Sequence, residues 1–503
     1  MPSADALLQT FAQPEVILHP ATAAIATILV IISIYIYGTY PFRILKKLKI
    51  PGPQPLAFSG NLKEVEKHGG LHLALLEYKK KYGKVFSLCM GRHVAVVVAD
   101  PDMLRQILVK DFASFRNRFF RFPPNNKIKF GLMTAKDDDW KRIRSTLTPT
   151  FSSGKLKQMV SLIEESCDVL VEKLEEVADT GRSIDIFSWY SKMTFEVILS
   201  SAFGIKSDVQ RTPDNEFLLK ARSIFHPPAI LMMLMALPGA RLLRGLFSQS
   251  AGSLGYFLDL GDKIIRMRRE CKNERQDLLQ LMLVAHDPEG GNKGGLSDDE
   301  ITAQSATFLL AGHETSSNAL TFITYHLAMN PNIQEKLRQE ISASFKENPE
   351  KSLYEQCFAI EYLDCVVNES LRMNPPAHVM TRVCNKTCTV NGVIIPEGME
   401  VKYPIYALHH DPHLWTNPEK FDPDRFLSPA KDLINPFQFL PFGGGPRTCI
   451  GMRFAMLEIK MTLIKILRKH RFVRSPETQV PMNVVSGITL TSKDGLHIRL
   501  ETF

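Results

Sequence analysis

The pattern of hydrophobic and polar positions predicts a chain that is mainly helical. Residues 72–83 form an amphipathic stretch, and helical spacing of apolar residues then dominates until Met373. Two stretches, 85–101 and 388–404, alternate as strands do, and the second carries Asn391-Gly392, a tight-turn dipeptide, between β-branched residues. We therefore expect a mainly α fold with a small β portion.

One predicted helix is unusually long. Ser297 and Glu300 have the spacing of a capping box, acidic residues fill the first turn, and no proline intervenes before Asn330-Pro331. A helix of about 32 residues would be about 48 Å long, because each residue adds about 1.5 Å. Such a helix would traverse the whole globule.

The middle of this helix has an unusual composition for a core helix. Phe308, Ala311, Thr315 and Ala319 fall on one face, where the small residues leave room for a flat ligand. Glu314 and Thr315 interrupt an apolar run and are suited to binding water and passing protons. The pattern alone leaves a second interpretation open, a polar stripe that faces solvent.

The N-terminal region predicts a membrane anchor. Residues 16–42 contain no Asp, Glu, Lys or Arg, and a basic cluster begins at Arg43, so the positive-inside rule keeps the rest of the chain cytosolic. We expect a lumenal N-terminus and single-pass transmembrane helix over 1–42, a basic and proline-rich hinge over 43–60, and one catalytic domain over 61–503.

Composition and charge narrow the function only slightly. The chain has 503 residues, 45% hydrophobic residues and a net charge of +8, which is typical of a folded protein with a substantial core. Its eight cysteines lack the repeated C-x-x-C pairs of a zinc module and are too sparse for a disulfide framework. No nucleic-acid-binding motif accompanies the basic charge, so we expect no nucleic-acid partner.

The strongest candidate chemistry lies at residues 442–451, FGGGPRTCIG. Cys449 stands at the predicted start of a helix, where amide hydrogens favour a thiolate. Glycines allow close approach to a bulky planar ligand, and Arg447 supplies a cation for an anionic group. Together these features describe a thiolate-ligated haem, although a solitary cysteine is more commonly an inert buried thiol.

The pattern F-x-x-G-x-R-x-C-x-G resembles the haem-binding signature of the cytochrome P450 superfamily, and the chain resembles this family over essentially its entire length. Three further motifs occur in the family's order: WKRIR with Trp140 and Arg144, AGHET with Glu314 and Thr315, and ESLR followed by FDPDRF. The last pair implies a buried structural network of Glu369, Arg372 and Arg425.

The resemblance is greatest to the vertebrate microsomal group often numbered family 3, with thromboxane synthase as a near relative. It implies haem b with Cys449 as the axial ligand of the iron. The remaining residues implied to bind the haem are Arg118, Trp140, Arg144, Ala311, Arg382, Phe442 and Arg447.

The resemblance further implies a monooxygenase that inserts one oxygen atom from O₂ into steroids, fatty acids or xenobiotics. Thr315, assisted by Glu314, would deliver protons. NADPH would supply electrons through NADPH-cytochrome P450 reductase, with cytochrome b5 as a further partner, at the endoplasmic reticulum membrane. An isomerase of lipid endoperoxides is the alternative enzyme, which Thr315 disfavours, and a haem sensor or carrier is the alternative outside enzymes.

Two surfaces complete the expectations. Aromatic and small residues would line the substrate pocket: Phe119, Phe120, Phe122, Phe130, Phe308, Ala311 and Thr315. The alternative is that they are ordinary core residues. The apolar segment 226–247 would touch membrane lipid. Basic residues would surround the thiolate side of the haem and bind an acidic reductase: Lys141, Arg142, Arg453, Lys460, Lys465 and Lys469. The alternative is that they form only a solvent-exposed helix face.

Overall fold

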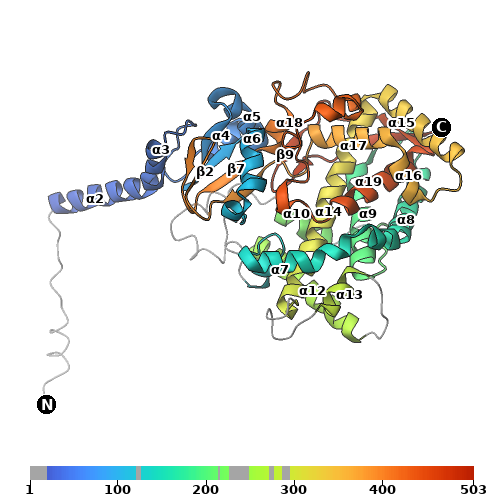
Figure 1. Cartoon of the computed structure of the whole chain (residues 1–503), viewed down its shortest axis with the longest axis horizontal. Helices are drawn as coiled ribbons and strands as arrows, with labels where there is room; N and C mark the ends of the chain where they lie inside the picture. Colours follow the sequence, from blue (N-terminus) through green and yellow to red (C-terminus); the bar gives the residue numbers. More distant parts are fainter. Residues whose placement is uncertain (1–19, 121–125, 213–215, 226–247, 271–276, 286–294) are drawn as a thin grey trace, which may run out of the picture.

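The computed structural model describes residues 20–120, 126–212, 216–225, 248–270, 277–285 and 295–503. These residues form a helical body with four small sheets, and the largest sheet lies at the end of the body next to the N-terminal helix (Figure 1). The predicted fold class is therefore confirmed. The helices that matter for the site are α7 (Asp137–Leu147), α8 (Ser153–Glu175), α9 (Ile186–Phe203), α10 (Glu216–Phe225), α12 (Ser248–Glu270), α14 (Asp298–Met329), α17 (Glu361–Met373) and α19 (Met452–Leu467).

The largest sheet has four strands in the order β1-β2-β7-β4. A separate three-stranded sheet has the order β3-β11-β8, formed by β3 (Ile184–Asp185), β11 (His497–Thr502) and β8 (His470–Arg474). Strands β1 (Val85–Met90) and β2 (His93–Val98) form the predicted antiparallel hairpin. Strand β7 (Glu400–Tyr403) runs parallel to β2 and antiparallel to β4 (Met380–Val383). The sheet thus places residues near 380 beside residues near 400.

The second predicted hairpin is also present. Strands β5 (Cys388–Val390) and β6 (Val393–Ile395) pair antiparallel. The two residues between them, Asn391 and Gly392, have φ values of 46° and 79°, as a tight two-residue hairpin turn requires.

Helix α14 has the bounds and the cap that its sequence predicted. It spans 32 residues, and the Ser297 side chain accepts from the Glu300 amide while the Glu300 side chain accepts from the Ser297 amide. The helix ends at Met329, and its C-cap Asn330 directly precedes Pro331. It crosses the centre of the globule and packs against α9, α12, α17 and α19 (Figure 1).

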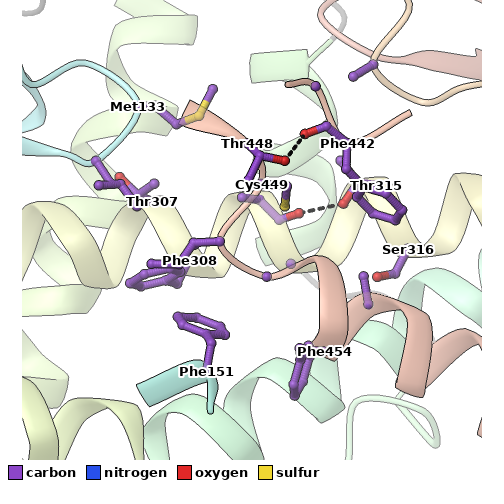
Figure 2. A pocket seen from close by; sticks show the side chains of 18 of the residues that line it. Met133, Phe151, Thr307, Phe308, Thr315, Ser316, Phe442, Thr448, Cys449 and Phe454 are labelled. Atoms are coloured by element: carbon purple, nitrogen blue, oxygen red, sulfur yellow. Dashed lines mark hydrogen bonds between the residues drawn. The ribbon is translucent and has the colours of Figure 1, made fainter. Parts of the chain in front are cut away.

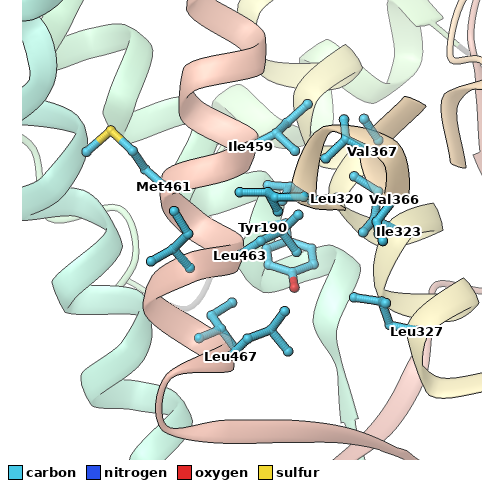
Figure 3. Close-up of a cluster of buried hydrophobic side chains, with 14 of the residues drawn as sticks. Tyr190, Leu320, Ile323, Leu327, Val366, Val367, Ile459, Met461, Leu463 and Leu467 are labelled. Atoms are coloured by element: carbon cyan, nitrogen blue, oxygen red, sulfur yellow. The ribbon is translucent and has the colours of Figure 1, made fainter. Parts of the chain in front are cut away.

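The largest hydrophobic core fixes the C-terminal half of α14. Figure 3 shows side chains from α14, α17 and α19 meeting around Tyr190 of α9. The Tyr190 hydroxyl lies 2.8 Å from Thr324 Oγ1, so the polar tip of this buried ring is satisfied. This packing holds α14 and α19 in one rigid frame.

The N-terminal helix α2 (Pro20–Thr39) extends away from the globule (Figure 1). Its apolar side chains are largely exposed; Ile31, for example, is 60% exposed. With the short helices that follow, it forms a continuous span of 29 residues, Pro20–Leu48, that is long and apolar enough to cross a membrane.

The expected hinge over 43–60 is more ordered than a free spacer. Helix α3 (Arg43–Leu48) occupies the basic part. The proline-rich part lies along strand β1 and is held there by two hydrogen bonds. The Ser87 amide donates to the Pro51 carbonyl at 2.7 Å, and the Asn61 amide donates to the Cys89 carbonyl at 2.6 Å. The three prolines prevent a helix here, and the segment instead attaches to β1.

Candidate active site

Cys449 lies in a tight loop, residues 442–451, directly before helix α19. Its amide donates to the Phe442 carbonyl at 2.9 Å, and the Thr448 hydroxyl donates to the same carbonyl at 3.2 Å (Figure 2). Gly445 has a φ of +70°, and a Cβ added there would lie 2.0 Å from the Leu108 carbonyl oxygen. Glycine is therefore required at this turn of the loop.

The sulfur of Cys449 is surrounded by protein and open only to an internal cavity, which accounts for its exposed surface. Burial raises the pKa of this thiol, whereas the Gly451 amide and the cations Arg118 and Arg144 oppose that rise. Helix α19 begins at Met452, so Cys449 precedes the helix and does not lie just inside its start as predicted. The predicted help from amide hydrogens at the helix start is present, because it comes from Gly451, the N-cap residue.

The cavity has a volume of about 270 Å³ and lies between the Cys449 loop and α14. Thr307, Phe308, Ala311 and Thr315 line it along one face of α14, and Figure 2 shows Phe308 beside Phe151. The exposure of Ala311, in the middle of an otherwise buried helix, is cavity surface. The predicted small-residue face of α14 thus faces a cavity and not solvent.

Glu314 and Thr315 differ in position although they are adjacent in sequence. The Thr315 hydroxyl donates to the Ala311 carbonyl at 2.8 Å and borders the cavity (Figure 2). Glu314 is 3% exposed, does not border the cavity, and accepts from Asn318 Nδ2 at 3.2 Å. A proton route from Glu314 to Thr315 would therefore need a water molecule or a movement of the side chain.

Four guanidinium groups gather at one edge of the cavity. Arg118, Arg144 and Arg447 line it, and Arg382 is fully buried beside them. Arg118 Nη2 donates to the Arg447 carbonyl at 3.0 Å, and Arg382 Nη1 donates to the Thr381 carbonyl at 2.9 Å. Among the described residues, no carboxylate lies within ion-pair distance of any of the four.

These cations destabilise one another in the polypeptide alone. Burial lowers the pKa of Arg447 to about 8, with further contributions from Arg118 and Arg382, and burial lowers the pKa of Arg118 to about 10. The Nε atoms of Arg118, Arg382 and Arg447 have no hydrogen-bond partner. Buried charges of one sign require an anion, so this edge is built for a ligand with more than one negative group.

The cavity and its residues fit a haem. The apolar walls suit a flat ring, the cationic edge suits two propionates, and Cys449, the one thiol among the described residues that line the cavity, suits the iron. Trp140 also lines the cavity, with its ring 4.3 Å from the Arg447 guanidinium carbon. Phe442 lines the cavity beside Cys449, so all the predicted haem-binding residues converge on this region.

The buried ionic network lies behind the site. Glu369 accepts from Arg372 Nε at 2.7 Å and from Arg425 Nε at 3.3 Å. Glu369 and Arg372 are both fully buried, and Arg372 Nη1 also donates to the His409 carbonyl at 2.7 Å. None of these three residues borders the cavity, although Leu371, next to Arg372, does. The network therefore stabilises the packed helices behind the site and does not contact a ligand.

The predicted aromatic roof is mostly displaced from the cavity. Phe119 stacks on His93 with ring centroids 4.0 Å apart, and neither Phe120 nor Phe130 borders the cavity. Phe122 and the segment 226–247 lie outside the described residues. The aromatic side chains that do border it are Phe151, Phe308, Phe442 and Phe454, together with Trp140.

The predicted docking cations are largely engaged within the chain. Lys460 is 2% exposed and lies 2.6 Å from Asp364. Arg142 pairs with Glu300, Lys465 lies 2.9 Å from Glu164, and Lys469 pairs with Glu175. Helical spacing alone could not reveal these partners, because they come from other helices. Of the six, only Lys141 and Arg453 are exposed and form no ion pair within the described part of the chain.

Sequence reasoning missed much of the cavity wall. Most of the additional lining residues come from segments with no chemical motif: Leu132, Met133, Phe151, Ile198, Ser201, Ala377 and Met380. Two more lie next to predicted site residues: Ile450 in the loop of Cys449, and Thr307 on α14. Thr307 was the one that helical spacing offered, because it lies four and eight residues before Ala311 and Thr315. The residues outside the motifs are brought together by packing between distant segments.

Comparison with known proteins gives the family. The family model described as Cytochrome P450 matches residues 50–499. Cytochrome P450 3A28 of Bos taurus is 39% identical over 471 residues, which cover 91% of this chain and 92% of the relative. Cytochrome P450 3A7 of Homo sapiens is 39% identical over 476 residues, 92% of this chain and 93% of the relative. The chain therefore belongs to the cytochrome P450 family and is a cytochrome P450 monooxygenase.

Proposed function

We propose that this chain inserts one oxygen atom from O₂ into lipophilic substrates such as steroids, fatty acids and xenobiotics. The observation that carries the proposal is that Cys449 and Thr315 border one apolar cavity, and that the four guanidinium groups at its edge pair with no carboxylate among the described residues. Haem bound there would be held by the Cys449 sulfur and would supply the chemistry that activates oxygen.

The chain's own residues would orient the ligands and handle protons. Arg118, Arg144, Arg382 and Arg447 would hold the propionates. The Thr315 hydroxyl donates to the Ala311 carbonyl, so its oxygen remains available to accept a hydrogen bond from water in the cavity. Glu314, buried one residue away, would supply protons to that water.

The lining of the cavity supports lipophilic substrates. Phe151, Phe308 and Ile198 present apolar surface, and Met380 adds an adaptable side chain. Few polar groups other than the cationic edge face the space, so a strongly hydrated substrate would lose more hydrogen bonds on entry than it regained. Shape and apolar contact would therefore select the substrate.

Location and electron supply complete the proposal. Helix α2 would anchor the chain in the endoplasmic reticulum membrane, and the basic residues after it would keep the catalytic domain cytosolic. NADPH-cytochrome P450 reductase would deliver the electrons, with cytochrome b5 as a further partner. Protease protection of sealed microsomes tests this orientation, because protection of the catalytic domain would contradict it.

Cys449→Ser tests the proposed ligand. The ferrous carbonyl complex of the wild type should absorb near 450 nm, about where thiolate ligation places it, and the variant should lose that band. Cys388→Ser, at a partly exposed thiol away from the cavity, is the matched control and should retain it. A band that survives Cys449→Ser would overturn the assignment.

Product analysis tests the reaction. The protein reconstituted with reductase and NADPH should oxygenate a steroid or a polyunsaturated fatty acid. Rearrangement of a lipid endoperoxide without NADPH, with no oxygenated products from the other substrates, would favour the isomerase instead.

A further inference from the structure

Tyr403, at the end of β7, is fully buried, and its hydroxyl has no hydrogen-bond partner among the described residues. A buried hydroxyl without a partner destabilises a folded protein, so such groups are rare in native structures. The resemblance to the family assigned no role to this residue. Its surroundings therefore indicate what would satisfy the hydroxyl.

The register of the sheet directs the Tyr403 side chain toward the cavity. Tyr403 is the direct antiparallel partner of Met380, and Val401 is the partner of Arg382. Directly opposed residues of an antiparallel pair project from the same face of a sheet. Since Met380 lines the cavity, the Tyr403 ring lies on the side of the sheet that faces it.

The surroundings of the hydroxyl are the cationic edge of the cavity. The Arg382 guanidinium carbon lies 5.6 Å from the centroid of the Tyr403 ring. Arg118 is close enough to Tyr403 for the two groups to interact electrostatically. A Cβ added to Gly443 would lie 3.6 Å from the hydroxyl oxygen, so the tip of Tyr403 also reaches the loop that carries Cys449.

We propose that Tyr403 is a further haem-binding residue, whose hydroxyl donates a hydrogen bond to a propionate carboxylate held by Arg118 and Arg382. The inference rests on the proposed haem site and adds a neutral donor to its cations. A phenol is suited to this place because it adds a hydrogen bond without adding another positive charge to a crowded cluster. The carboxylate would in turn satisfy the buried hydroxyl.

Tyr403→Phe in the haem-loaded, full-length protein tests the inference. Transfer of haem to apomyoglobin should be faster by on the order of tenfold, because a charge-assisted hydrogen bond is lost while the ring is kept. The resonance Raman band of propionate bending should shift as well. Tyr190→Phe is the control, since that hydroxyl is also buried but lies 2.8 Å from Thr324 Oγ1, within the hydrophobic core and away from the cavity.

The control separates cofactor binding from general destabilisation. Tyr190→Phe should leave the Raman band in place and change haem transfer by less than Tyr403→Phe does. Equal acceleration in both variants with an unshifted band, or no change in Tyr403→Phe, would overturn the role of Tyr403. A wild type without the carbonyl band near about 450 nm would instead overturn the haem site itself, and this inference with it.

Discussion

Replacement of Glu369 by Gln is the most direct test of how the frame behind the site is stabilised. The Glu369 carboxylate accepts from Arg372 Nε at 2.7 Å, Arg372 Nη2 at 2.9 Å and Arg425 Nε at 3.3 Å. It also accepts from the Asp422 amide at 2.9 Å. Gln removes the negative charge and turns an NH₂ group toward these donors.

The expected loss follows from burial. Glu369 and Arg372 are both fully buried, so the variant leaves a guanidinium in the core without a counter-charge. Breaking a buried pair in this way costs about 3–5 kcal/mol. The unfolding entropy is about 2.1 cal/mol/K per residue, so for a domain of roughly 450 residues this loss corresponds to a fall of about 3–5 °C in the unfolding midpoint.

The measurement is the thermal midpoint of the haem-loaded protein, followed by circular dichroism at one scan rate. Lys80→Gln is the control, because Lys80 and Glu77 form an ion pair at 2.7 Å with side chains 56% and 47% exposed. Exposed pairs contribute about 0–1 kcal/mol, so its midpoint should fall by about 1 °C or less. A Glu369→Gln midpoint as close to the wild type as that of the control would refute the reasoning.

Three further predictions concern proton delivery, a buried acid and electron supply. Thr315→Ala should lower the product formed per NADPH about tenfold or more and raise peroxide release, because the hydroxyl at the cavity is lost; unchanged coupling would contradict its role. Burial raises the pKa of Glu458 from 4.5 to about 8, so the folded state holds a proton that the unfolded chain releases, and stability falls as pH rises through that window. Glu458→Gln cannot ionise, so the thermal midpoint of the variant relative to that of the wild type should be higher at pH 8 than at pH 5. The same difference between the two midpoints at both pH values would count against a neutral, buried carboxylic acid at Glu458. Reduction by the reductase should change less than about threefold between about 0.05 and 0.5 M salt, because most of the predicted docking cations are paired within the chain; a steep salt dependence in stopped-flow reduction would show that the remaining cations dominate docking.

Some expectations from the sequence were wrong for identifiable physical reasons. Lys460 reads as a surface cation on helical spacing, but its side chain is buried and pairs with Asp364 of α17, which is 36% exposed. Phe119 reads as a cavity residue because it is aromatic, yet it stacks on His93 of the neighbouring sheet. In both cases the partner is distant in the chain, and composition carries no record of it.

The features that the sequence by itself determined are those built from local interactions. The cap of α14 involves residues three apart, the Asn391-Gly392 turn joins adjacent strands, and the span of α2 follows from a continuous apolar run. The motif around Cys449 can also be read within ten residues, although the close contact that requires glycine at 445 is with Leu108, far away in the chain.

Only the tertiary structure decided which distant groups share the site. Arg118, Arg382 and Arg447 come from separate segments, and their lost hydration and mutual repulsion exist only once packing has brought them together. Tyr403 is opposed to Met380 by the register of two strands, which no short stretch of sequence specifies. Local hydrogen bonds determine the helices, strands and turns. The packing of side chains from distant parts of the chain determines which charged groups and hydrogen-bond donors face the cavity.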